Sequence, residues 1–243
     1  MRLQRFFISE KIGDKKTITI NSADMINQIS RVFRLKGGDH IILFDNSGFD
    51  YEGALDNALE RTILISIKTI DVCITNVRPS RYVSERGICL YASIIKKSNF
   101  ETVVEKVTEL GVSRIVPVLS SRSEKKSLNE ERLKKIAIEA SEQSGRGVVP
   151  EMSKISTLGE ALQEVATLGR PRTSFAFHTE GKPWNKAVVE EKTDLAFFIG
   201  PEGGWTTEEI EMFHRSGVEV VCLGKQILRA ETAAIVAVAQ AVF

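Results

Sequence analysis

The stretch that decides the fold covers residues 195–210 and reads LAFFIGPEGGWTTEEI. Its hydrophobic first half predicts a buried strand, which ends in a glycine-rich segment at residues 200–204. Thr206 lies three residues before Glu209, and this spacing predicts a capping box that opens a helix reaching about Arg215. A strand, a glycine-rich loop and a helix in this order indicate an α/β protein whose loop backbone can approach a ligand closely. The alternative is an ordinary turn between a strand and a helix.

A second loop follows the predicted strand at residues 218–224 and leads into a predicted helix at residues 233–243. This helix is apolar nearly all round, so it must be buried, either in the core or against another subunit. Arg229 and Glu231 stand at its edge, where a charge needs a partner or a role. The two alternatives are a structural ion pair and a functional pair of charges.

Strands and helices alternate along the part of the chain that precedes these loops. Predicted strands cover residues 88–95, 114–119 and 174–178, and predicted helices cover residues 100–110, 129–144 and 157–168. The last of these helices opens with a capping box of Thr157 and Glu160. Because the strands lack polar alternation, we expect a parallel sheet covered by helices on both faces. Such sheets bind ligands at the carboxyl ends of their strands, where both loops lie.

Residues 1–72 predict a small β-rich domain in front of an α/β domain at residues 73–243. Predicted strands at residues 5–8, 17–20, 40–46 and 61–70 are separated by turns at residues 13–14, 37–39 and 46–48, with one helix at residues 22–31. Short strands at this spacing predict a small barrel or an open sheet.

The composition of the 243 residues excludes several classes of protein. Hydrophobic residues make up 42% and charged residues 27%, which are values of a globular protein and not of a disordered chain. No apolar run is long enough to span a bilayer, and the first residues lack the apolar stretch of a secretory signal. Three scattered cysteines, Cys73, Cys89 and Cys222, indicate a reducing compartment, so we expect a cytoplasmic protein with no membrane partner. No cluster of Cys and His has the spacing of metal ligands, so we expect no metal.

The formal net charge of +1 argues against a strongly basic nucleic-acid binder only until it is divided by region. Residues 73–146 carry 14 basic and 9 acidic side chains, a net charge of +5. Residues 147–243 carry 9 basic and 13 acidic side chains, a net charge of −4. The basic segment is either a solvated helix face or a patch that contacts the phosphates of a nucleic acid.

The glycine-rich loop does not fit the common phosphate-binding patterns, because it lacks both the Gly-Lys-Ser/Thr ending and the GxGxxG spacing. Glu202 places an anion beside the start of a helix, where it would repel a phosphate. The loop is therefore better suited to a neutral nucleoside or to a cationic group.

Two motifs together point to a family. FIGPEGG at residues 198–204, followed by LGKQILRAETAA at residues 223–234, resembles the ribosomal RNA small subunit methyltransferase E family of SPOUT methyltransferases. Further family-like motifs lie at residues 5–7, 31–39, 105–112 and 142–146, so the resemblance covers nearly the whole chain. Three positions depart from the pattern: the segment before Arg31 lacks a histidine, Trp205 replaces a smaller residue, and Ala230 replaces a frequent threonine.

The resemblance implies an α/β fold in which a PUA-like β-barrel that binds RNA precedes a SPOUT methyltransferase domain, a parallel sheet with a trefoil knot. It also implies a homodimer that transfers a methyl group from S-adenosyl-L-methionine to N3 of a specific uridine in 16S rRNA of the small ribosomal subunit. Because N3 is a pairing position, the uridine must be unpaired or flipped out. The alternatives are a SPOUT-fold RNA-binding protein without activity and a SPOUT methyltransferase that acts on transfer RNA.

The resemblance and the loops together give three groups of candidate residues. The candidates for cofactor binding are Phe177, His178, Ile199, Gly200, Pro201, Glu202, Gly203, Gly204, Leu223, Gly224, Ile227, Leu228, Arg229, Thr232 and Ala233. The catalytic candidates are Arg229, which would polarise the uracil, and Glu231, which would act beside it or orient it. His178 and His214 are candidate bases, with His214 expected at the surface. The candidates for RNA contact are Arg5, Arg31, Arg34, Arg122, Gln143 and Arg146.

Overall fold

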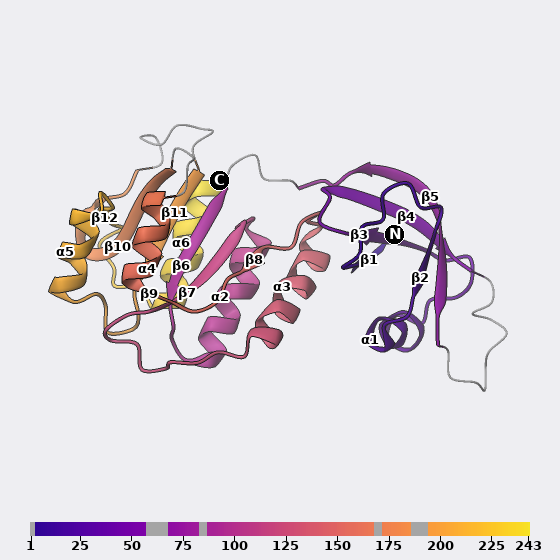
Figure 1. Ribbon diagram of the computed structural model, residues 1–243, viewed down its shortest axis with the longest axis horizontal. Coiled ribbons are helices and arrows are strands. Elements are labelled where there is room, and N and C mark those ends of the chain that lie inside the picture. The colour runs from indigo at the N-terminus through magenta and orange to yellow at the C-terminus, as the bar shows by residue number, and fades with distance from the viewer. Residues whose placement is uncertain (1–2, 57–67, 83–86, 168–171, 186–193) are drawn as a thin grey trace. The chain divides into compact units, whose positions relative to one another are not determined.

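The computed structural model describes residues 3–56, 68–82, 87–167, 172–185 and 194–243, which belong to two compact units (Figure 1). The small unit comprises Met1–Val83 and Ser141–Val148, and the large unit comprises Ser84–Ala140 and Val149–Phe243. The boundary expected between residues 72 and 73 falls inside a strand of the small unit. The small unit also takes in a short segment from the middle of the chain, which no local pattern in the sequence signals.

The small unit contains one five-stranded sheet in the order β1-β3-β4-β5-β2. Its strands are β1 (Gln4–Phe7), β2 (Thr17–Ile20), β3 (His40–Phe44), β4 (Phe49–Leu55) and β5 (Ile70–Pro79). β1 pairs with β3 in parallel, and the other neighbours are antiparallel. The strands predicted at residues 5–8, 17–20 and 40–46 are confirmed. The strand predicted at residues 61–70 lies almost entirely outside the described residues.

β4 is not predicted from the sequence, because its Asp, Glu and Gly residues lower its local preference for a strand. A tight turn nevertheless pairs it with β3, and this turn places Asn46 at φ 61° and Gly48 at φ 84°. The turn itself was predicted at residues 46–48. The strand is therefore specified by its partner and by its turn more than by its own composition.

The helix predicted at residues 22–31 forms in two pieces. Ser22 caps α1 (Ala23–Asn27) by accepting a hydrogen bond from the Met25 backbone N–H, and the chain continues as a π-helical turn, η1 (Gln28–Val32). Such wide turns are rare and often lie at functional sites. Arg34 follows at φ 54°, a left-handed conformation that few residues other than glycine adopt.

A buried ion pair joins β1 to β4 across β3. The two terminal nitrogens of Arg5 lie 2.6 and 2.8 Å from the carboxylate oxygens of Asp50, a bidentate pair. Arg5 also donates to the carbonyl of Arg146 at 2.9 Å, and the Phe7 N–H donates to the Glu142 carboxylate at 3.0 Å. These hydrogen bonds from β1 hold the segment from the middle of the chain in the small unit.

The large unit is built on a parallel sheet in the order β12-β10-β11-β6-β7-β8, with β9 beside β7. Its strands are β6 (Ile88–Ser93), β7 (Arg114–Leu119), β8 (Glu151–Met152), β9 (Ser156–Thr157), β10 (Arg172–Pro183), β11 (Asp194–Ile199) and β12 (Glu219–Cys222). All the neighbouring strands pair in parallel, so their carboxyl ends lie at one edge. The predicted parallel sheet is confirmed.

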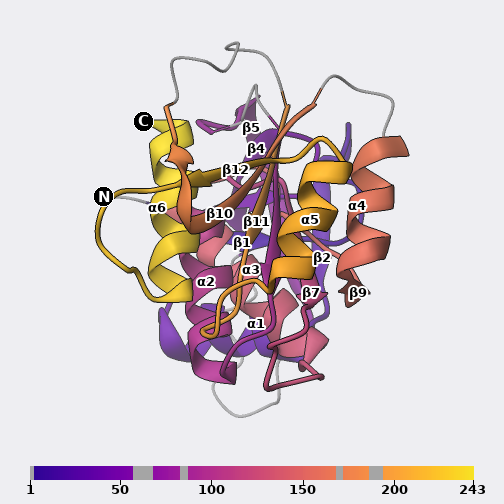
Figure 2. The ribbon, with the colours of Figure 1, turned by 90° about the vertical axis from the view of Figure 1, so that its left-hand side faces the viewer.

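Helices cover both faces of this sheet, as predicted (Figure 2). Side chains of α2 (Lys97–Glu109), of α3 (Glu130–Ser144) and of α6 (Ala230–Val242) share one core with Leu90 and Phe197. Those of α4 (Leu158–Thr167) and α5 (Thr207–Arg215) share the other core with Tyr91 and Phe198. Consecutive residues of β6 and β11 thus point into opposite cores, which explains why these strands are hydrophobic throughout.

One helix starts earlier than predicted, and the predicted end of another cannot be compared with the structure. α6 begins at Ala230, three residues earlier than predicted, because Arg229 takes the N-cap position. The predicted end of α4 at Leu168 lies outside the described residues, and Thr157 and Glu160 form the predicted capping bonds at its start.

The buried ion pair of the small unit gives a stability prediction. Asp50→Ala should lower the free energy of unfolding by about 3–5 kcal/mol, because it leaves the buried Arg5 guanidinium uncompensated. Glu10→Ala is the matched control, since the Glu10–Lys15 pair is exposed and should contribute less than about 1 kcal/mol. Urea denaturation of the full chain, followed by circular dichroism, measures both losses. Equal losses for the two variants would contradict the structural role given to Asp50.

Candidate functional site

The large unit has a pocket of about 710 Å³ at the carboxyl ends of β11 and β12 and at residues 177–179 within β10. It also takes in residues from the start of α6. Of the 15 cofactor-binding candidates, 14 line this pocket, and Thr232 alone does not. Both catalytic candidates, Arg229 and Glu231, line it as well. Eight lining residues were not among the candidates for cofactor binding or catalysis: Lys96, Asn99, Arg122, Thr179, Trp205, Cys222, Gln226 and Ala230.

Trp205 fixes the glycine-rich loop to the neighbouring strand. Its indole N–H donates a hydrogen bond to the carbonyl of Phe177 on β10, at 3.2 Å, and its ring packs edge-on against Phe213 with centroids 4.9 Å apart. A Cβ atom on Gly200 would lie only 3.2 Å from the Trp205 ring, so the glycine allows the ring to lie against the loop backbone. The departure from the family pattern at Trp205 is therefore a specific structural contact.

Glu209 ties the same loop to a third strand end. It forms the predicted capping box with Thr206, whose N–H lies 2.8 Å from one Glu209 carboxylate oxygen. The other carboxylate oxygen accepts a hydrogen bond from the Ser121 N–H, just after β7, at 2.8 Å. The carboxylate is almost completely buried, so these hydrogen bonds replace the water that it loses. The capping box could be read from the sequence, but the bond to Ser121 could not.

β10 carries an irregularity that shapes another wall of the pocket. Phe177 and Lys182 both pair with Val221 of β12, so the four residues between them are looped out of the ladder. Gly181 closes this bulge against β12, and a Cβ atom there would lie 2.4 Å from the carbonyl carbon of Val221. His178 and Thr179, at the start of the bulge, therefore face the pocket.

The ring of His178 is oriented by its own bulge. Its Nδ1 accepts a hydrogen bond from the Glu180 N–H at 3.2 Å, so a neutral ring carries its proton on Nε2. In this tautomer the ring offers a donor to the pocket and not a basic lone pair. His214, the other candidate base, is exposed on α5 and does not line the pocket, as expected.

The charged residues of the pocket are largely unpaired. Glu202 accepts a hydrogen bond from the Lys96 N–H at 3.3 Å. Arg229 is exposed and forms no ion pair or hydrogen bond through its side chain with any described residue. Glu231 is half-buried, and its buried Oε2 has no hydrogen-bond partner among the described residues. The structural ion pair considered for Arg229 and Glu231 is thus absent from this part of the chain.

The candidates for RNA contact fall into two groups. Arg31 and Arg34 are exposed in and after η1, Gln143 is exposed near the end of α3, and Arg122 lines the pocket. Arg5 and Arg146 lie instead in the interior of the small unit. Burial lowers the pKa of the Arg146 guanidinium to about 10, so it remains protonated at neutral pH. The expectation that these two side chains contact RNA did not include their burial. The partner of Arg5, Asp50, is 45 residues away, so no local pattern signals the buried pair.

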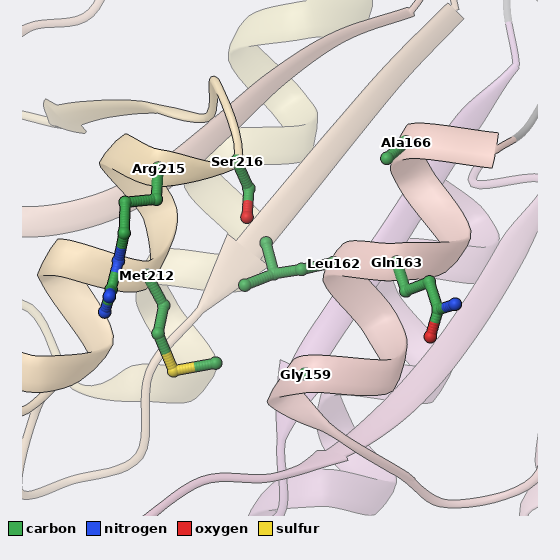
Figure 3. Close-up of a pocket in the computed structure, with 7 residues that line it drawn as sticks. All are labelled: Gly159, Leu162, Gln163, Ala166, Met212, Arg215 and Ser216. Carbon is green, nitrogen blue, oxygen red and sulfur yellow. The ribbon is translucent and has the colours of Figure 1, made fainter.

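A second hollow of about 420 Å³ lies between α4 and α5 (Figure 3). Leu162 of α4 and Met212 of α5 point into it, and Arg215 is its one charged lining residue. Its lining includes the Ser216 hydroxyl but no carboxylate or imidazole that could activate it, so the strand-end pocket is the better candidate site.

Neither a metal-binding group nor a membrane-spanning helix is found within the described ranges. No group of three His, Cys, Asp or Glu side chains there is arranged to hold a metal ion. No helix in the same ranges combines the length and the hydrophobicity needed to cross a membrane.

Comparisons with known proteins agree on one kind of relative. The family model for the RNA methyltransferase domain matches residues 84–242. Ribosomal RNA small subunit methyltransferase E of Synechocystis is 32% identical, over 92% of this chain and 72% of the relative. The protein of the same name from Rickettsia conorii is 26% identical, over 99% of this chain and 95% of the relative.

Several solved structures resemble nearly the whole chain, and two of them are known with a bound cofactor. The first is ribosomal RNA small subunit methyltransferase E from Neisseria gonorrhoeae bound to S-adenosyl methionine, with a TM-score of 0.83 and 28% identity, covering 98% of this chain and 96% of that one. The second, from Legionella pneumophila, is a complex with the cofactor SAM, with a TM-score of 0.84 and 26% identity, and it has the same coverage.

The two tryptophans of the chain test the anchoring of the glycine-rich loop. Trp205→Phe removes the hydrogen bond to Phe177, whereas Trp184→Phe removes an indole N–H that is buried without a partner among the described residues. The loss of ring volume is the same in both. Trp205→Phe should therefore lower the free energy of unfolding by about 1 kcal/mol more than Trp184→Phe. Urea denaturation followed by far-ultraviolet circular dichroism measures this difference, and equal losses would remove the anchoring role of Trp205.

Proposed function

Because the chain belongs to the ribosomal RNA small subunit methyltransferase E family, we propose that it transfers a methyl group from S-adenosylmethionine to N3 of a uridine in 16S rRNA. The observation that carries this proposal is the strand-end pocket, which brings together 14 of the 15 cofactor candidates and both catalytic candidates. The choice of N3 rests on the resemblance of the two loop motifs to those of the family.

The residues of the pocket fit this cofactor. Its adenosine is neutral, and backbone groups of the two loops can bind it without a charged side chain. Its sulfonium is a cation, and the carboxylates of Glu202 and Glu231 both line the pocket. The buried Oε2 of Glu231 has no partner among the described residues, so it is available to a donor or a cation of a ligand.

The reaction sets two tasks for the chain. When bound, S-adenosylmethionine supplies an electrophilic methyl group on sulfur. Uracil N3 carries a proton and becomes a nucleophile only as that proton leaves. The N3–C bond forms as the S–C bond breaks, so the products are an N3-methylated uridine, S-adenosylhomocysteine and one proton. The protein must receive or release that proton and stabilise the negative charge that develops on the uracil ring.

We assign the stabilisation of this charge to Arg229. Its guanidinium lines the pocket, and no carboxylate among the described residues neutralises it. At the N-cap of α6 it also stands at the positive end of the helix dipole, which favours an anion nearby. Glu231, two residues further on, is assigned to the cationic side of the cofactor. The ordered tautomer of His178 makes it a donor to the ligand more than a base.

The remaining architecture is proposed on the same family basis. We propose that the small unit is a PUA-like barrel whose exposed Arg31 and Arg34 contact RNA, and that the strands of the large unit are threaded into a trefoil knot. A homodimer is proposed on the same family basis. An enzyme that acts on ribosomal RNA is expected where ribosomes are, in the cytoplasm.

Transfer of a labelled methyl group to isolated small ribosomal subunits, free 16S rRNA and transfer RNA tests the reaction. We expect label in the ribosomal substrates, and in Arg229→Ala we expect kcat to fall by about 10²–10³ while S-adenosylhomocysteine still binds. Lys225→Ala is the matched control, because Lys225 is exposed in the same loop and does not line the pocket.

Three outcomes would contradict parts of this proposal. Label found in transfer RNA alone would favour a transfer RNA methyltransferase. Tight RNA binding with no transfer would favour a non-catalytic RNA-binding protein. Near-normal turnover of Arg229→Ala would leave the reaction intact and remove Arg229 from its assigned role.

The charge on the cofactor tests the role of Glu231. Glu231→Gln should weaken the binding of S-adenosylmethionine by about tenfold, because the lost carboxylate no longer attracts the sulfonium. It should affect S-adenosylhomocysteine much less, since its sulfur is neutral. Isothermal titration calorimetry measures both affinities, with Glu208→Gln as a control outside the pocket. Unchanged affinities with a fall in turnover would instead assign Glu231 to the proton.

A further inference from the structure

The pocket has a wall that the cofactor-binding and catalytic assignments leave unused. Lys96 and Asn99 reach it from the loop after β6 and the start of α2, and Arg122 reaches it from the loop after β7. β6 and β7 are neighbours in the sheet and parallel, so the loops that follow them leave from the same edge. The two motifs that resemble the family follow β11 and β12, and they supply other parts of the pocket lining.

The polar groups of this wall are available to a ligand. The Lys96 ammonium has no partner among the described residues, and the side-chain oxygen of Asn99 accepts from Ser98 at 3.3 Å, which leaves its amide N–H groups free. Arg122 donates to the carbonyl of Gly203 at 2.6 Å. That bond orients the guanidinium but does not neutralise it. The Glu208 carboxylate lies close enough to attract it, but no ion pair forms between them.

The same two loops carry further cations away from the pocket. The five cations of these loops are Lys96, Lys97, Arg122, Lys125 and Lys126, and all are exposed. Glu124 is the one acidic residue between residues 94 and 98 and between residues 120 and 129. Glu202 lies beside the Lys96 N–H and offsets part of the charge at the pocket itself. Lys96 and Arg122 line the pocket, and the other three cations follow them in the sequence by one to four residues. Glu101 lies close enough to Lys97 for their charges to attract.

We propose that these loop cations form a track for the sugar–phosphate backbone of the RNA strand that carries the target nucleotide. Phosphates repeat along a strand, and a row of cations that continues beyond the pocket complements such a repeat, whereas a single carboxylate of a small ligand would need only one of them. Lys96 and Arg122 are the two cations of these loops that line the pocket, so the track reaches the pocket at these residues. This inference rests on the proposed function, because it takes the occupant of the pocket to be a nucleotide of an RNA strand.

Salt dependence of RNA binding tests the track without requiring turnover. The probes are free 16S rRNA and a fluorescent oligouridylate, titrated with S-adenosylhomocysteine present. Lys96→Ala and Lys125→Ala should each reduce the slope of log Kd against log salt by about 0.7–0.9, the contribution of one phosphate contact. Both should raise the KM for RNA several-fold while kcat and the affinity for S-adenosylhomocysteine stay the same. Arg215→Ala removes the same charge from the end of α5, at the edge where β12 begins, and should change none of these values.

The outcomes separate this inference from the proposed function. Unchanged slopes and KM values in both lysine variants, with an active wild-type enzyme, would overturn the track alone. A loss of affinity for S-adenosylhomocysteine in Lys96→Ala would instead show that this wall binds the carboxylate of the cofactor. A wild-type chain that binds RNA with the expected slopes but transfers no methyl group would leave the track in place and overturn the proposed reaction.

Discussion

The parallel pairing of β12, β10, β11, β6 and β7 is the constraint on which the rest of the site depends. Only parallel neighbours bring successive carboxyl ends to one edge, so the loops after β6, β7, β11 and β12 meet there, beside the bulge within β10. Parallel strands need long crossovers, and the helices that supply them cover both faces and force the strands to be hydrophobic throughout. The same requirement that buries the sheet therefore leaves its loops as the one place for polar chemistry.

Loops rich in glycine need anchors, because glycine loses more conformational entropy on ordering than other residues do. Two side chains provide them. Trp205 binds the glycine-rich loop to β10 through the Phe177 carbonyl, and Glu209 binds the start of α5 to the loop after β7 through Ser121. A pocket whose walls are held in this way loses less entropy when a ligand binds. Trp205, which departs from the family pattern, therefore helps to hold the glycine-rich loop of the site in place.

A feature of the fold or of the site is predictable from the sequence when the residues that determine it are close together along the chain. The capping box of Thr206 and Glu209 depends on three residues, and it placed α5 correctly. The burial of Arg5 is not predictable from local sequence, because its partner Asp50 is 45 residues away. Lys96 belongs to the basic segment at residues 73–146, but its place in the pocket is not predictable either, since only the order of the strands in the sheet brings it beside the loops after β11 and β12. Local sequence patterns therefore predict the loops, whereas the set of residues that line the pocket depends on which strands pair in the sheet.

A contrast between two pairs of charges supports the proposed role of the pocket. In the small unit, Arg5 and Asp50 find each other across 45 residues and form a buried bidentate pair. In the pocket, Arg229 and Glu231 are two residues apart and do not pair, and a buried oxygen of Glu231 is left without a partner among the described residues. A sequence selected for stability alone would satisfy that oxygen, since an unpaired buried acceptor costs about 1–3 kcal/mol. Local rules that fail in this way mark sites where the missing partner is a ligand.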